Sequence, residues 1–170
     1  MECIFIHCYI LLLRLNKDKI MITKGMMTSK TDLWATPQDF FEKLNERYNF
    51  NTDVCALPEN AKVQNFFTPE MDGLKQEWKG VCWMNPPYGR EISKWVKKAY
   101  EEANKHDSTI VALLPARTDT RWFHDWIYMM YGVEIEFIKG RLKFGGSKNS
   151  APFPSMLVVF QKNIFSNNCI

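Results

Sequence analysis

The sequence predicts an α/β fold in which a mostly parallel sheet carries helices on both faces. Short apolar runs alternate with amphipathic helical segments, and the run at 111–114 is apolar throughout. A strand without polar positions is typical of a parallel sheet that helices cover on both sides. The order of strands and helices therefore favours a doubly wound sheet, in which ligands bind at the carboxyl ends of the strands.

Length and composition are those of one globular domain. The chain has 170 residues, of which 46% are hydrophobic and 24% charged. About 100–200 residues form one domain, and this composition excludes disorder, collagen-like repeats and coiled coil. A net charge of +3 permits binding to a polyanion without requiring it, since phosphate contacts need only a local basic patch.

The first 31 residues differ from the rest. The apolar run at 1–13 is too short to span a bilayer and lacks the leading positive charge of a signal peptide. The lysine-rich stretch at 17–30 has the composition of a linker. We therefore expect residues 1–31 to form an N-terminal extension or linker, which either packs on the body as a short element or takes no part in the fold. The domain is expected at 32–165.

A helix is predicted at 37–48. Thr36 is expected to act as its N-cap, with Pro37 at the first helical position, where the missing N–H costs nothing, and Asp39 in the first turn. The apolar side chains recur at three- and four-residue spacing, which predicts one buried face. They are Phe40, Phe41, Leu44 and Tyr48.

Six short apolar runs, each bounded by polar or turn residues, predict strands. They lie at 50–55, 63–67, 81–84, 109–114, 133–138 and 156–161. Two amphipathic helices are predicted between them, at 92–103 and 122–130. The run at 156–161 has no helix before it, so it is expected to pair antiparallel to its neighbour after a long loop.

The five cysteines form no C-x-x-C pair, and their odd number and irregular spacing suit neither a disulfide framework nor a zinc site. We expect reduced thiols in a cytoplasmic protein without a metal. Aromatic residues make up 14% of the chain, and most lie on helix faces that should be buried. Four others are candidates for a ligand pocket: Trp34, Tyr88, Phe144 and Phe153.

The strongest chemical signal is Asn85-Pro86-Pro87-Tyr88, at the end of the strand at 81–84. Two prolines fix the backbone and remove two donors, so neighbouring carbonyls are left as acceptors. Asn85 supplies another acceptor oxygen and Tyr88 a flat ring. This set suits a planar amino group on a base. The alternative is a strand-ending turn in which the asparagine caps and the tyrosine packs.

The NPPY tetrapeptide resembles the catalytic motif of amino-group methyltransferases that use S-adenosylmethionine. An ordered series of further segments resembles the phage DNA N6-adenine methyltransferase family, often called Dam-like, and covers about 32–162. The segments are DLWATPQDFFEKL, TDVCALPENAKVQNFF, DGLKQEW, NPPYGREISKWV, LLPARTDTRWFH, IKGRLKFGG and APFPSMLVVF.

The resemblance implies a Rossmann-like S-adenosylmethionine-dependent methyltransferase fold and transfer of a methyl group to the N6 amino group of adenine in DNA. Asn85 and the Pro86 carbonyl would accept hydrogen bonds from that amino group, Pro87 would stiffen the turn, and Tyr88 would stack on the flipped base. Neither a covalent intermediate nor a metal is needed. Alternatives are a methyltransferase of RNA or of protein glutamine amides, and an inactive DNA-binding relative.

Candidate cofactor residues also follow from the resemblance. Asp53 ends the first strand, but no G-x-G loop follows it, and only about ten residues separate it from the next predicted strand. Small or polar residues after Asp53 are candidates for the cofactor: Ala56, Glu59 for the ribose hydroxyls, Asn60 and Ala61. Thr36 and Pro37 would touch its methionine end, or form a plain helix cap. Asp72 would lie near its adenine ring, or in a solvated turn.

Basic residues are candidates for DNA contact. Arg117 and Arg121 flank a predicted helix start, where the alternative is ordinary solvation. Four more basic residues surround a Gly-rich loop that also holds Phe144 and Phe153, namely Lys139, Arg141, Lys143 and Lys148. This interleaving suits a DNA-facing loop; the alternative is a charged strand edge that discourages aggregation. DNA is thus the expected partner, with no membrane, in a bacterial or phage-infected cell.

Overall fold

The computed structural model describes residues 34–147 and 149–163. The predicted extension at 1–31 and the DNA candidate Lys148 lie outside the described residues. Within the described ranges, none of the helices is long and apolar enough to cross a membrane.

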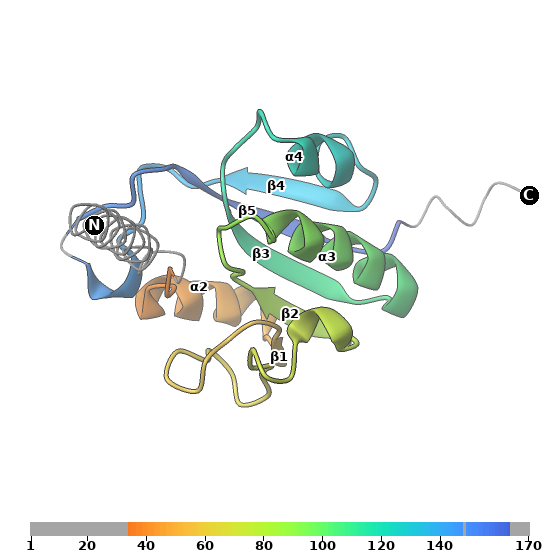
Figure 1. The fold of residues 1–170 in the computed structure, drawn as a ribbon, viewed down its shortest axis with the longest axis horizontal. Helices are drawn as coiled ribbons and strands as arrows, with labels where there is room; N and C mark the ends of the chain where they lie inside the picture. The colour runs from red at the N-terminus through yellow and green to blue at the C-terminus, as the bar shows by residue number, and fades with distance from the viewer. Residues whose placement is uncertain (1–33, 148, 164–170) are drawn as a thin grey trace, which may run out of the picture. The chain divides into compact units, whose positions relative to one another are not determined.

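A five-stranded sheet, in the order β1-β2-β3-β5-β4, forms the centre of the described part of the chain (Figure 1). The strands are β1 (Thr52–Asp53), β2 (Val81–Met84), β3 (Thr109–Pro115), β4 (Val133–Phe137) and β5 (Ser155–Phe160). β1, β2 and β3 pair in parallel, and β5 pairs antiparallel to both β3 and β4. Four strands therefore share one direction and the last opposes them, which confirms the predicted fold class.

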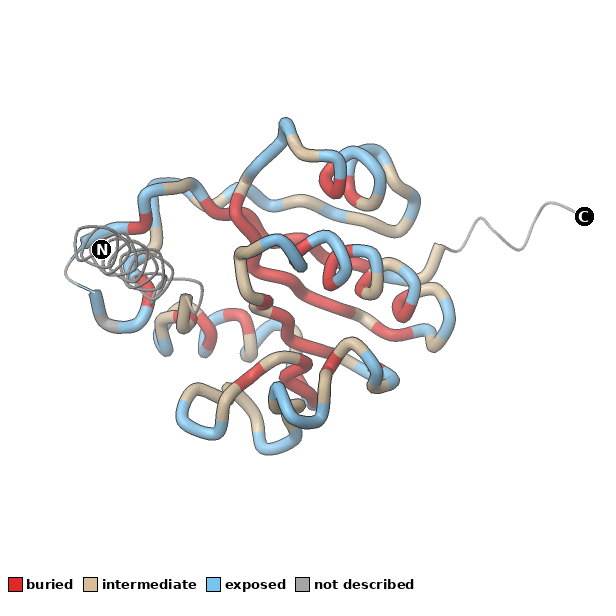
Figure 2. Tube along the Cα trace, viewed as in Figure 1, coloured by how far each residue is buried: buried red, intermediate tan, exposed pale blue. Residues whose placement is uncertain are grey.

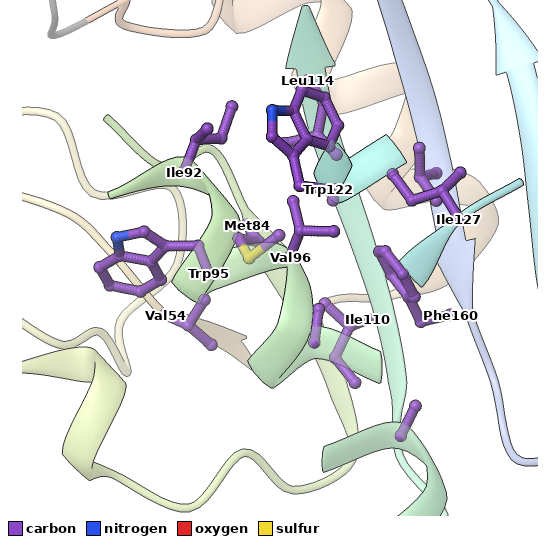
Figure 3. Close-up of a cluster of buried hydrophobic side chains, with 14 of the residues drawn as sticks. Val54, Met84, Ile92, Trp95, Val96, Ile110, Leu114, Trp122, Ile127 and Phe160 are labelled. Carbon is purple, nitrogen blue, oxygen red and sulfur yellow. The ribbon is translucent and has the colours of Figure 1, made fainter. Parts of the chain in front are cut away.

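Helices cover both faces of this sheet. On one face, α3 (Ile92–His106) and α4 (Arg121–Trp126) pack on β3 and β5 in a cluster that includes Trp95, Val96 and Ile110 (Figure 3). On the other face, Phe41 and Leu44 of α2 (Gln38–Tyr48) join Val111 and Leu113 of β3. β3 thus buries alternate side chains against different helices, so its positions must be apolar on both sides.

Burial follows position in the sheet (Figure 2). Every residue of β5 is buried, as is every residue of β3 except the first, while β4 at the sheet edge is half-buried or exposed. Phe137 on β4 is 60% exposed. The central strands therefore provide the rigid base from which the loops at their carboxyl ends project.

Two strand predictions need correction next to β1. The strand predicted at 50–55 is reduced to Thr52–Asp53. The strand predicted at 63–67 is wrong: it makes one isolated bridge, between Asp53 and Phe66. The chain after β1 turns back within a few residues, where Asn60 bonds to the main chain of Leu57. A two-residue edge strand gives the returning segment too little length for a ladder.

The helix predicted at 122–130 ends early, at Trp126. The amide of Tyr128 donates to the Phe123 carbonyl, five residues back, and Met129 adopts a positive φ of 57°. These features break the regular hydrogen-bond pattern. By contrast, α3 extends through the whole predicted apolar face and ends at His106, and the next residue, Asp107, adopts the left-handed conformation.

Candidate functional site

The NPPY segment follows β2 at the carboxyl edge of the sheet, and the Asn85 side chain is held in one orientation. Its Nδ2 donates to the main-chain carbonyl of Trp34 at 2.5 Å and to the Thr36 hydroxyl at 3.0 Å. Its Oδ1 is buried and has no hydrogen-bond partner among the described residues. Both donors of the amide are therefore used, and its acceptor is free. A buried unpartnered oxygen is costly and marks a place where a ligand donor fits.

The two prolines add to this surplus of acceptors. Pro86 is buried, and no donor in the part of the chain that the structure describes bonds to its carbonyl. Neither Pro86 nor Pro87 has an N–H. The turn therefore has two unpaired acceptors, the Pro86 carbonyl and Asn85 Oδ1, and neither proline adds an N–H donor beside them.

Tyr88 is fixed by its hydroxyl and by its ring. The hydroxyl donates to the carbonyl of Leu113 on β3 at 3.1 Å, and burial raises its pKa well above the usual value, so it remains neutral. The ring meets Phe144 and Phe153 edge-on, with centroids 6.3 and 5.6 Å away. Trp34 contacts the same two phenylalanines at 5.4 and 5.0 Å. The four aromatic residues predicted around the pocket are thus brought together.

The prediction that the Gly-rich loop faces DNA needs correction at Phe144. It is only 3% exposed and packs against Trp34 and Tyr88. Its ring therefore faces the protein interior rather than a nucleic acid. Phe153 is half-buried in the same cluster.

A cleft of about 240 Å³ opens beside Tyr88, at the carboxyl ends of β2 and β3. Its lining combines apolar, small and basic side chains: Tyr88, Gly89, Arg90, Ile92, Ser93, Pro115, Arg117 and Trp122. The predicted DNA residue Arg117 therefore lies next to the NPPY motif. Arg90 was missed by sequence reasoning, although its position directly after NPPYG is a signal that could have found it.

Asp53 ends β1 beside this region and is 3% exposed. Its Oδ1 accepts from the amide of Cys55 at 3.3 Å and its Oδ2 from the amide of Lys62 at 3.2 Å. Burial raises its pKa to about 6, against the opposing effect of these hydrogen bonds and the Lys62 charge. The carboxylate therefore orders the loop that follows β1. The neighbouring Cys55 thiol bonds to the Asn85 main chain, and burial raises its pKa well above the usual value.

The remaining cofactor candidates lie in two turns near Asp53. Ala56 is buried, Asn60 closes a local turn through Leu57, and Glu59 is exposed. Ala61 bonds to the Leu57 carbonyl. Asp72 caps its own turn at the amide of Leu74 and pairs with Lys75 Nζ at 2.9 Å.

Gly73 lets the turn that holds Asp72 approach the end of β1. A Cβ at this position would lie 2.2 Å from the Val54 carbonyl oxygen. The structure therefore brings Asp53 and the Asp72 turn to the same end of β1 without a glycine-rich loop between them.

The prediction that Thr36 caps the first helix is wrong. The carbonyl of Pro37 accepts the first helical hydrogen bond, from Phe41 at 3.0 Å, and no side chain caps the helix. Thr36 is 5% exposed, and its hydroxyl accepts from Asn85 instead. These two residues are 49 positions apart, so no local pattern could reveal the contact.

The basic candidates differ in their surroundings. Lys139 and Lys143 are exposed, and Arg141 donates to the Ala151 carbonyl at 3.5 Å. Arg121 has a side chain 96% exposed, with Nε 4.0 Å from Asp125. Of these residues, none lines the cleft described above, in contrast to Arg117.

Among the described residues, no group of three or more His, Cys, Asp or Glu side chains has a metal-binding arrangement.

Comparisons with known proteins agree with the motif. The family model described as DNA N-6-adenine-methyltransferase (Dam) matches residues 24–168. A DNA N-6-adenine-methyltransferase of Haemophilus phage HP1 (strain HP1c1) is 36% identical over 151 residues, which are 83% of this chain and 86% of that protein. Another, of Escherichia phage T1, is 41% identical over 95 residues, which are 54% of this chain and 39% of that protein.

A solved structure of a proposed RNA methyltransferase from Pyrococcus horikoshii aligns with a TM-score of 0.42 at 18% identity. The alignment covers 59% of this chain and 52% of that one. The evidence for the fold class is therefore the strand order and helix placement described above. The evidence for the family is the family model and the phage proteins. With a family model that matches nearly all of its length, the chain belongs to the DNA N-6-adenine-methyltransferase (Dam) family.

Proposed function

We propose that this protein transfers a methyl group from S-adenosylmethionine to the N6 amino group of adenine in DNA. The observation that carries the proposal is the unpartnered buried Oδ1 of Asn85, in a chain of the Dam family. An exocyclic amino group offers two N–H donors, and the NPPY turn offers two acceptors, Asn85 Oδ1 and the Pro86 carbonyl. The donor and acceptor sets match in number.

These acceptors would also activate the amino group. The N6 lone pair is delocalised into the purine ring, which makes the nitrogen a poor nucleophile. Hydrogen bonds to two fixed acceptors draw its hydrogens out of the ring plane and leave the lone pair on the nitrogen, so positioning and electrostatics lower the barrier. When bound, S-adenosylmethionine would supply a methyl group on a positively charged sulfur, so that the nitrogen–carbon bond forms as the sulfur–carbon bond breaks, a neutral thioether leaves and N6 releases one proton. The protein's task is to align the nitrogen with that methyl group.

The residues at the carboxyl end of β1 fit such a cofactor in chemistry. S-adenosylmethionine presents an ammonium group, ribose hydroxyls and an adenine amino group, all donors. Asp53 and Asp72 supply carboxylates, and the small side chain of Ala56 permits close approach of the main chain. Asp53, with its pKa near 6, is mostly ionised at neutral pH and so can accept. We assign these three residues to the cofactor, with Glu59 and Asn60 at the outer edge.

Adenine in a duplex must leave the base stack to reach these acceptors. The Tyr88 ring, fixed by its hydroxyl bond to Leu113, lines the cleft and would stack on the flipped base. Arg117 on the same cleft would contact a neighbouring phosphate, and the exposed Lys139 and Lys143 would meet phosphates further along.

Methyl transfer with labelled cofactor tests the proposal. Unmethylated DNA should become labelled at adenine N6, and N85A should lower kcat by about 1000-fold, as removal of a transition-state hydrogen-bond partner does. Binding of S-adenosylmethionine should change little. N104A is a matched control, because Asn104 also forms side-chain hydrogen bonds, to Tyr100 and Asn163, but lies on α3. Label in RNA or protein alone, or full turnover by N85A, would contradict the proposal.

A further inference from the structure

The orientation of the Asn85 amide is determined from outside its own loop. A main-chain carbonyl can only accept a hydrogen bond, so the amide atom that faces the Trp34 carbonyl must be the nitrogen. Thr36 Oγ1 accepts the second hydrogen of the same nitrogen. If the amide turned over, its oxygen would face the Trp34 oxygen and a donor would replace the free acceptor. Segment 34–36 therefore decides which atom of Asn85 is left for a ligand.

This segment is itself held by the loop before β5. The Trp34 ring packs edge-on against Phe144 and Phe153, and the amide of Gly145 donates to the Ala35 carbonyl at 2.8 Å. Thr36 is 5% exposed. The atoms that orient Asn85 are thus fixed by packing and by a main-chain hydrogen bond, which is the condition for a preorganised acceptor.

We propose that Thr36, together with the Trp34 carbonyl, positions Asn85 so that Oδ1 faces the amino group, and that the Trp34 carbonyl specifies an amide rather than a carboxylate at position 85. The inference rests on the proposed function, since it assumes that Asn85 Oδ1 is the catalytic acceptor. Thr36 acts through Asn85 and is a positioning residue.

The main test compares T36V with T36S. Valine has nearly the shape of threonine but cannot accept from Asn85 Nδ2, so kcat should fall by about tenfold to a hundredfold, while KM for DNA and Kd for S-adenosylmethionine change less than about threefold. Serine keeps the hydroxyl and should restore most of the rate. In ¹⁵N spectra, the Asn85 side-chain amide signals should shift in T36V and return in T36S.

T52V is a matched control. Thr52 is also 5% exposed, and its Oγ1 accepts from an asparagine Nδ2, that of Asn65, at 2.8 Å. The same chemical change at the same burial should leave kcat unchanged. A fall in kcat in both variants would mean that loss of any buried threonine hydroxyl is enough, and would overturn the positioning role.

N85D separates acceptor chemistry from orientation. A carboxylate accepts from an amino group at least as well as an amide does. Its second oxygen, however, would face the Trp34 carbonyl, where the structure requires a donor; the Thr36 hydroxyl can turn to donate to a carboxylate, but the carbonyl cannot. The inference predicts at least about a tenfold fall in kcat for N85D. Wild-type kcat in N85D would overturn the claim that segment 34–36 selects the amide.

The outcomes distinguish this inference from the function on which it rests. Full activity of N85A overturns both. If N85A is inactive but T36V has wild-type kcat, only the positioning role fails. If T36V binds S-adenosylmethionine weakly yet turns over normally at saturation, Thr36 contacts the cofactor and the positioning role also fails. Should T36V not fold, N85D, which retains Thr36, decides whether segment 34–36 selects the amide, and wild-type kcat in N85D then overturns the inference.

Discussion

The two ends of β2 carry buried polar groups of opposite character. At the amino end, Glu102 accepts from the amide of Trp78 at 2.8 Å and pairs with Lys98 at 2.9 Å. Ser108 donates to the Trp78 carbonyl at 2.8 Å. At the carboxyl end, Asn85 uses both amide hydrogens within the protein and leaves Oδ1 without a partner among the described residues.

Under the proposed function, this difference separates a structural cluster from a functional one. The Glu102 cluster joins α3, the segment before β2 and the segment before β3, and both oxygens of its buried carboxylate accept hydrogen bonds. His106 Nε2, 3.5 Å from this carboxylate, is buried without a hydrogen-bond partner among the described residues. Such a cluster stabilises the fold. The Asn85 cluster keeps one acceptor unpaired at a stability cost, which the ligand donor of the proposed function would offset. Variants at the first end should change stability, and variants at the second should change turnover.

The largest effect on stability is expected from E102A. It leaves the buried Trp78 amide and the half-buried Lys98 ammonium without their acceptor, so the free energy of unfolding should fall by about 3 kcal/mol. E101A is a matched control on the same helix, because Glu101 pairs with Lys97 at the surface and should matter little. Urea unfolding measures both. Equal stability of the two variants would show that the buried cluster does not stabilise the fold.

A second effect on the free energy of unfolding is expected at Asp53, and it depends on pH. Burial raises its folded pKa from 3.8 to about 6, so the folded protein holds this proton more tightly than the unfolded chain does. Its contribution to the free energy of unfolding therefore decreases as pH rises from about 4 to about 6, by up to about 3 kcal/mol.

The measurement is the unfolding free energy of wild type and D53N across this pH window. Other carboxyl groups titrate in both proteins, so their contributions cancel in the difference. D53N should gain stability relative to wild type as pH rises, with no further change well above pH 6. Parallel pH curves for the two proteins would contradict the assignment.

The smallest effect is expected from Y88F. It removes the hydroxyl that donates to the Leu113 carbonyl but keeps the ring and its aromatic neighbours, so stability should fall by about 1 kcal/mol and kcat only a few-fold. Y88A removes the stacking surface as well and should lower kcat far more. If Y88F were as inactive as Y88A, the hydroxyl rather than the ring would be the important part of Tyr88.

The sequence predicts best where one element carries a strong periodic pattern. The strand at Val81–Met84 and the helix beginning at Ile92 are found where the apolar pattern places them, because burial on two sides of a sheet requires that pattern. The acceptors of the NPPY motif can be identified from the sequence equally well, because they are adjacent in the chain. The predicted strand at 63–67 is wrong because its partner, Thr52–Asp53, is too short to form a ladder with it.

Long-range contacts define the part of the site that the sequence could not predict. Thr36 has a local pattern typical of a helix cap, yet its hydroxyl accepts from Asn85. Phe144 lies among basic residues, yet its ring is buried against Trp34. In both cases tertiary packing overrides a local preference, and no spacing rule within one segment reveals the partner.

The most direct test of the account combines turnover and stability in two variants. N85A should lose about 1000-fold in kcat while its free energy of unfolding stays within about 1 kcal/mol of wild type, and E102A should show the reverse. That result would assign function to the carboxyl end of β2 and stability to its amino end. Methylation of adenine by N85A at the wild-type rate would contradict the account.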